Sequence, residues 1–178
     1  MSYDGSSAQD IDDFSAKSGP YNNLDLDGGA EKDLTGNTTV NGVLSWSADV
    51  DMETNGHTLT IKQSPTGGNT NSRLIIGGSS STVSVAYSSS STNECIIPVG
   101  IDGSVRDISI TAASGTAETY TVVYTPGSPG TINWNTTPTG VAINPSADAA
   151  HVNNHYYYDI SRSGSVNATL KLLSLIHI

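Results

Sequence analysis

The chain has 178 residues, of which 35% are hydrophobic, and its 17 acidic and 7 basic residues give a net charge of −10. A surface this negative repels phosphate backbones and anionic lipid head groups, so we expect no nucleic-acid partner. No apolar run approaches the roughly 20 residues of a membrane-spanning helix, so we expect no membrane insertion. The apolar residues are nonetheless regularly spaced, which indicates thin β layers rather than disorder.

Short segments of alternating apolar and polar residues follow one another along the chain, separated by Gly, Asn, Asp and Ser. A period of two residues predicts strands, and helical periodicity is almost absent. The predicted fold class is therefore all-β. The segments expected to form strands are Leu24–Leu26, Val40–Leu44, Val50–Met52, Leu59–Ile61, Leu74–Ile76, Val83–Val85, Ile108–Ile110, Tyr120–Tyr124 and Val166–Leu172.

Over residues 1–92 these segments are very short, which favours a short β-solenoid-like repeat region. Four aliphatic residues open segments at intervals of 16, 19 and 15 residues, namely Leu24, Val40, Leu59 and Leu74. Asn-Gly pairs at 41–42 and 55–56 mark tight corners. A meander of ordinary hairpins is the alternative. The expected core consists of Leu24, Leu26, Leu34, Val40, Leu44, Leu59, Ile61, Leu74 and Ile76.

Residues 93–172 contain longer and cleaner alternation, which predicts an antiparallel β-sandwich module. In its last strand we expect four side chains to face the core, those of Val166, Ala168, Leu170 and Leu172. Cys95, the single cysteine, precedes two isoleucines and is expected to be a small buried side chain rather than a reactive thiol. The proline-rich residues 125–150 suit a long connection or a pair of edge strands.

Two polar stretches are expected to lie outside the β layers, and both ends of the chain are expected to be cut. Residues 64–72 and 88–93 are predicted to be exposed loops. Residues 173–178 match the translation of a sequencing adapter, and we expect this tail to be adapter-derived. The residues after Met1 lack a basic start and an apolar stretch, so we expect no signal peptide there.

No motif in the chain predicts catalysis, a cofactor or a metal site. His151 and His155 have the spacing of a helical zinc pair, but a third ligand is missing from the motif. The acids at 25, 27, 49 and 51 lie near turns and lack the spacing of known calcium loops, so solvated turn acids are the simpler interpretation. No nucleophile elbow, phosphate loop or dinucleotide fingerprint is present.

Aromatic side chains provide the only candidate ligand contacts. We expect that an exposed platform of these rings would stack on sugars, although aromatic strands are more often core or interface. The candidate ligand-contacting aromatics are Trp46, Trp134, Tyr156 and Tyr157.

Two long patterns in the chain resemble a known kind of protein. The first covers residues 5–61 and includes Tyr21 to Leu26, Asn37 to Leu44 and Asn55 to Ile61. The second includes Ile97 to Gly100, Arg106 to Ile110, Tyr120 to Val122 and Tyr156 to Ile160. The first is similar to a unit that recurs in very large secreted proteins of Bacteroidota-type bacteria, and the second resembles the module that often follows this unit.

This resemblance implies export by the type IX secretion route and a place outside the cell, either secreted or anchored at the outer membrane. It implies a non-catalytic, structural or adhesin-like module, with surface glycans or other cell-surface proteins as partners. The alternative function is a carbohydrate-binding module that uses exposed aromatics.

Overall fold

A computed structural model describes residues 1–12, 19–69, 71–75, 82–88, 92–101, 104–113, 117–126 and 156–172. Within these ranges the regular elements are strands, so the predicted all-β class is confirmed. The first ten are β1 (Ser2–Tyr3), β2 (Gln9–Ile11), β3 (Leu24–Leu26), β4 (Lys32–Leu34), β5 (Thr38–Val40), β6 (Leu44–Trp46), β7 (Met52–Glu53), β8 (Thr58–Ile61), β9 (Leu74–Ile75) and β10 (Thr82–Tyr87). The others are β11 (Cys95–Ile97), β12 (Gly100–Ile101), β13 (Ser104–Val105), β14 (Ile108–Ala112), β15 (Glu118–Pro126), β16 (Tyr156–Arg162) and β17 (Ala168–Leu172).

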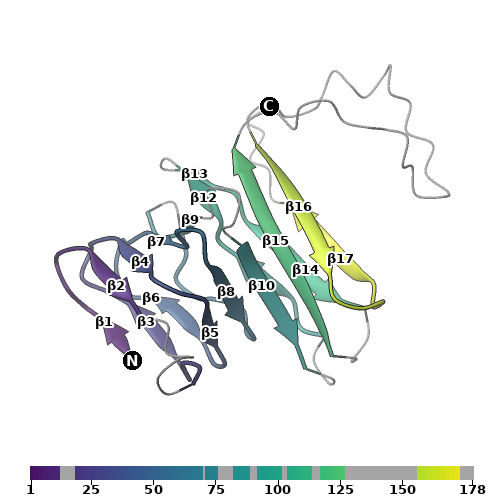
Figure 1. Cartoon of the computed structure of the whole chain (residues 1–178). Helices are drawn as coiled ribbons and strands as arrows, with labels where there is room; N and C mark the ends of the chain where they lie inside the picture. Colours follow the sequence, from purple (N-terminus) through teal and green to yellow (C-terminus); the bar gives the residue numbers. More distant parts are fainter. Residues whose placement is uncertain are drawn as a thin grey trace.

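Strands β1 to β10 wind as a three-sided parallel coil, which is the predicted β-solenoid (Figure 1). The first side is β1-β3-β6, the second is β2-β4-β7-β9, and the third contains β5, β8 and β10. Each turn of the coil places a residue beside one that lies 20 to 24 positions later, as in Leu24 beside Leu44 and Leu59 beside Val83. The shorter intervals expected from the sequence do not give the length of a turn, because Leu24 and Leu74 lie on other sides of the coil than Val40 and Leu59. Val40 and Leu59 share the third side, but Val40 pairs with Ile61 and not with Leu59.

One predicted strand, Val40–Leu44, is a corner of the coil instead. β5 ends at Val40 and β6 begins at Leu44. Between them Gly42 N donates to Asn22 O at 2.5 Å, and Val43 N donates to Asn23 Oδ1 at 2.9 Å. These residues therefore form a corner that hydrogen-bonds to the corner of the preceding turn, and they do not continue a strand.

The core of the coil is the set of side chains that alternate inward from its short strands. The expected residues from Leu24 to Leu74 are all buried, while Ile76 lies outside the described residues. Burial of each such aliphatic contributes about 1.5–3 kcal/mol. Lys32 differs from these aliphatic residues because it is charged. Its side chain is nonetheless 0% exposed, and its Nζ donates to Gly5 O at 3.1 Å. Burial lowers the pKa of this ammonium group.

A single five-stranded sheet joins the coil to the second half, in the order β16-β15-β10-β8-β5. β10 pairs with β8 in parallel and with β15 in antiparallel register. The sheet therefore continues across residue 92, where the sequence suggested a boundary between two modules. One buried hydrophobic cluster likewise includes Leu59 of the coil and Ile110 of the second half.

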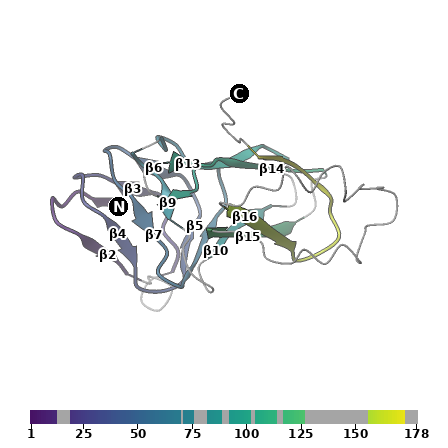
Figure 2. The ribbon, with the colours of Figure 1, turned by 90° about the horizontal axis from the view of Figure 1, so that it is seen from above.

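The second half is a sandwich in which part of this long sheet faces the antiparallel sheet β11-β14-β17, and Figure 2 displays the two layers from above. Three tyrosine hydroxyls cross between the layers. Tyr87 donates to Ile110 O at 2.5 Å, Tyr120 to Val166 O at 2.8 Å, and Tyr158 to Arg106 O at 2.5 Å. These bonds satisfy hydroxyls that are wholly or partly buried, which would otherwise lose their hydrogen bonds to water.

The exposure of side chains corrects one further expectation and confirms most of another. Leu170 and Leu172 are 46% and 56% exposed rather than buried in the core, because β17 is an edge strand of its sheet. Most of the described residues of 64–72 are exposed as expected, although Thr66 pairs with Ser45 through an isolated bridge. Ser72 is fully buried, and its Oγ donates to Ala48 O at 2.9 Å.

Candidate functional site

The aromatic candidates do not come together as an exposed platform in the described part of the chain. Trp46 ends β6 with its ring inside the coil and is only 6% exposed, so it does not offer a face to a sugar. Tyr156 and Tyr157 belong to β16, where their backbones pair with Pro126 and Thr125, but their side chains lie outside the description. Trp134 also lies outside the described residues.

A cluster of acids lies on the outer face of the second side of the coil. Ligand oxygens of Glu31, Asp33 and Glu53 lie within 4.8 Å of one another, and we call these three residues the acidic cluster. The register of the coil explains the cluster, because Asp33 of β4 pairs directly with Glu53 of β7. Carboxylate oxygens at this spacing could hold a divalent cation such as calcium.

Desolvation and, after it, closely spaced like charges raise the pKa values of two residues in the acidic cluster. Desolvation raises the pKa of Glu31, and the neighbouring carboxylates of Asp33 and Asp51 raise it further. Desolvation also raises the pKa of Glu53, with the charges of Glu31, Asp33 and Asp51 as further causes. The ionised cluster therefore destabilises the folded chain at neutral pH.

Two neighbouring donors stabilise acids on this face, one as an ion pair and one as a neutral hydrogen-bond donor. Arg73 forms an ion pair with Asp51 at 2.6 Å between Nη2 and Oδ2. Asn55 Nδ2 donates to Asp33 Oδ1 at 2.6 Å. The negative charge of this face is thus partly compensated by Arg73 and by the hydrogen bond from Asn55.

Of the acids that the sequence singled out, Asp51 lies beside the acidic cluster, and the other three lie elsewhere. Asp25 Oδ1 accepts hydrogen bonds from Ser45 Oγ at 2.6 Å and Ser47 Oγ at 2.7 Å. Asp27 binds the backbone of Gly28, and Asp49 accepts a bond from Asn71. His151 and His155 lie outside the described residues. Asp25, Asp27 and Asp49 therefore accept hydrogen bonds within the coil.

A carboxylate clamp joins β15 to the turn between β16 and β17. Glu118 accepts hydrogen bonds from Ser163 Oγ at 2.6 Å, Gly164 N at 2.5 Å and Val166 N at 3.0 Å. The Ser163 bond is the largest cause that lowers the pKa of Glu118 to about 2, followed by the backbone donors. A carboxylate held in this way fixes a turn and is too acidic to act as a general acid or base near neutral pH.

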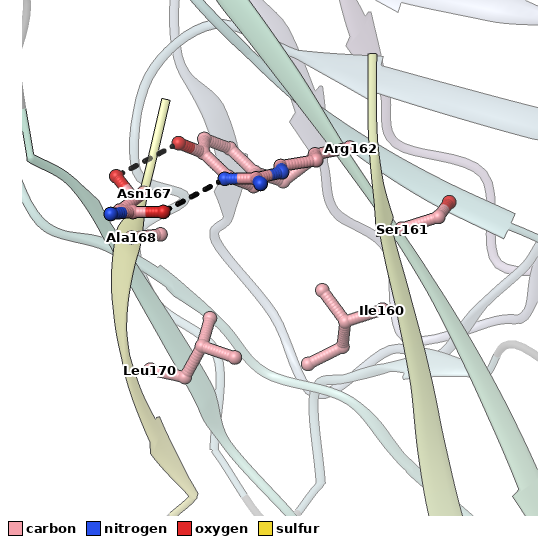
Figure 3. Close-up of a pocket in the computed structure, with 7 residues that line it drawn as sticks. Ile160, Ser161, Arg162, Asn167, Ala168 and Leu170 are labelled. Carbon is pink, nitrogen blue, oxygen red and sulfur yellow. Dashed lines mark hydrogen bonds between the residues drawn. The ribbon is translucent and has the colours of Figure 1, made fainter. Parts of the chain in front are cut away.

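A cavity of about 350 Å³ opens between β16 and β17 (Figure 3). Its lining includes Ile160 and Leu170, which approach each other from the two strands. At one end Arg162 Nη1 donates to Asn167 Oδ1 at 3.0 Å. The described lining contains neither a carboxylate nor a histidine, so it offers contacts but no acid–base pair.

Hydroxyl side chains cover the outer face of the long sheet. In-register pairing aligns one such residue from every strand of the sheet. This row consists of Thr39, Thr60, Ser84, Thr121 and Ser161. Ser84 and Thr121 hydrogen-bond to each other at 3.0 Å. The face is polar without being charged along this row.

No family model, curated protein or solved structure matches this chain. Among the described residues no helix is long and apolar enough to cross a bilayer. The function must therefore be inferred from the residues and their geometry.

Proposed function

We propose that the chain is a non-catalytic structural module, a stiff spacer with adhesin-like character in an extracellular or cell-surface bacterial protein. The observation that carries this proposal is the pairing of β10 with both β8 and β15. Because one sheet runs through the coil and the sandwich, the two halves cannot bend at a linker without breaking backbone hydrogen bonds.

The core supports the same proposal. Buried residues of both halves belong to one hydrophobic cluster, and the three tyrosine hydroxyls tie the two sandwich layers together. A large hydrophobic contact between two halves suppresses the relative motion that is otherwise expected of domains. A stiff body of this kind is suited to holding neighbouring domains apart.

The chemistry of the described surface supports a structural role over catalysis. The acidic cluster lies on an outer sheet face, and the cavity beside β17 has no acid–base pair in its described lining. Glu118, whose pKa is lowered to about 2, holds a turn. The proposed location rests on the sequence resemblance at residues 5–61 and in the second half.

Stiffness is tested by a distance measurement between spin labels at the two ends of the long axis. Asp10 and Asp159 are exposed, on β2 and β16, and serve as labelling sites after substitution by cysteine. Cys95 is buried and its pKa is raised to about 12, so it stays unlabelled. A stiff spacer gives one narrow distance distribution, whereas a broad or bimodal distribution would contradict the proposal.

Carbohydrate binding remains the competing function and is tested separately on a glycan array. The spacer proposal predicts no glycan binding that depends on Tyr157. Binding that disappears in Tyr157→Ala, but persists in a Trp46→Phe variant, would support a carbohydrate-binding module instead. Trp46 is a suitable comparison because its ring is buried.

A further inference from the structure

The two layers of the sandwich are open at one side, where the edge strands β16 and β17 flank the cavity (Figure 3). Leu170 and Leu172 of β17 pair in register with Ile110 and Ile108 of β14, so they lie on the same face of the sheet. The isoleucines are fully buried, whereas the leucines are 46% and 56% exposed. The leucines of this edge therefore lack much of the cover that the isoleucines have.

The same edge offers backbone hydrogen-bonding groups. Ala113 N donates to Asn167 O at 2.8 Å, so every second residue of β17, beginning with Thr169, directs its backbone groups toward β14. The residues that direct their backbone groups the other way are Ala168, Leu170 and Leu172. In the described part of the chain no strand pairs with that side of β17. A strand that binds there would gain backbone hydrogen bonds and cover apolar side chains.

We propose that β17 pairs with β17 of a second copy of this chain, antiparallel and around a two-fold axis at Leu170. Leu170 then lies opposite Leu170 of the second copy, and Ala168 lies opposite Leu172, so a small side chain meets a large one. The leucines of each copy enter the groove of the other beside Ile160. The two three-stranded sheets continue as one sheet. Because this isologous contact uses up the free edge, association ends at a dimer.

The charges of the edge favour a second copy at this place and in this register. Lys171 is the only charged residue of β17, and it forms an ion pair with Glu94 at 2.9 Å. An axis at Leu170 places Lys171 opposite Thr169, whereas an axis at Lys171 would place two lysines opposite each other. Symmetric pairing at the edge strand β2 would instead bring together two copies of Asp10, its central residue. The inference is independent of the spacer role, since a stiff body can be single or paired.

The dimer is tested by analytical ultracentrifugation of the intact chain over a range of concentrations. We expect a monomer–dimer equilibrium without larger species. Leu170→Ser should raise the dissociation constant by about 10- to 100-fold, because each copy loses the burial of about half a leucine side chain. Circular dichroism should show this variant folded, since Leu170 is already half exposed in a single chain. A monomer at every concentration, or a dimer unchanged by Leu170→Ser, would overturn the proposal.

Ile96→Ser is the matched control. Ile96 is 40% exposed on β11, the other edge strand of the same sheet, where its backbone nitrogen donates to Ser64 Oγ at 3.1 Å. Its replacement should leave the dissociation constant unchanged. Added salt should strengthen the dimer, because it screens the repulsion between two chains that each carry a net charge of −10. Loss of the dimer in Ile96→Ser, or its dissociation by salt, would contradict the proposed contact.

The register is tested by Leu170→Cys under mild oxidation. Opposite residues of a hydrogen-bonded antiparallel pair have Cα atoms about 5.5 Å apart, which a disulfide can span. We therefore expect a covalent dimer of this variant, while Cys95 stays unreactive because it is buried. Lys171→Cys is the control on the same strand and should not form the covalent dimer, because position 171 faces position 169. Cross-linking through position 171 alone would refute the register, and no cross-linking of either variant would overturn the proposal.

Discussion

Replacement of Leu59 by alanine tests whether the aliphatics of the coil are the source of its stability. Leu59 is fully buried in β8. This strand pairs with β10, which joins the coil to the second half. Removal of a buried leucine side chain leaves a cavity and costs about 2–5 kcal/mol. For a chain of this size about 1 kcal/mol lowers Tm by about 2–4 °C, so we expect a decrease of about 4–20 °C. Leu59→Asp should prevent folding, because a buried carboxylate there has no partner.

Thr60→Ala is the control, since Thr60 is the next residue of β8 and lies in the outward row of hydroxyls. Its replacement should change stability by no more than about 1 kcal/mol, the range of strand propensities. The assay is thermal unfolding followed by circular dichroism. Similar decreases for Leu59→Ala and Thr60→Ala would refute the assignment of inward and outward faces.

Three further variants or reagents test the electrostatics. The folded pKa of Glu118 is about 2, below its ordinary value of 4.5, so its stabilisation is present above pH 4.5 and is lost as the pH falls towards 2. Glu118→Gln should therefore lower Tm at neutral pH, and the difference from the parent chain should shrink through that acidic window. The pKa of Glu53 is raised, so Glu53→Gln should raise Tm at neutral pH, and this gain should disappear once acid protonates the parent carboxyl. A gain that persists in acid would mean that repulsion is not its cause. Cys95 is buried with its pKa raised to about 12, so a thiol reagent should modify it only after unfolding. Rapid reaction in the native chain would contradict its burial.

The period-two pattern predicted which side chains point inward, because alternation is a local property of an extended chain. Leu24, Leu59 and Leu74 are buried as expected. The same alternation places the side chain of Lys32 on the inward face, together with Leu34. Its burial was nonetheless unexpected, because lysine is charged. The carbonyl of Gly5, from the preceding turn, provides the partner that makes this burial tolerable.

The number of residues in one turn of the coil could not be predicted from the same local pattern. It depends on how corners stack, as in the bond from Gly42 N to Asn22 O, which joins residues 20 positions apart. The exposed edge at Leu170 was missed for a related reason. Alternation shows which side chains share a face of the strand, but it does not show whether another layer covers that face.

The acidic cluster was missed because its members lie on separate turns of the coil. Glu31 and Asp33 are followed by Asp51 and Glu53 at a separation of 20 residues, which equals the register between β4 and β7. Alternating acids that recur at the length of one turn are the signal that would have predicted the cluster. That signal becomes visible only once the length of a turn is known.

Hydrogen exchange under increasing denaturant is the most direct test of the shared sheet. If β10 joins the coil to the sandwich, the slowest amides of β8, β10 and β15 should open together, with one common free energy and one denaturant dependence. Separate openings for β8 and for β15, with β10 following only one of them, would contradict the account of a single stiff module.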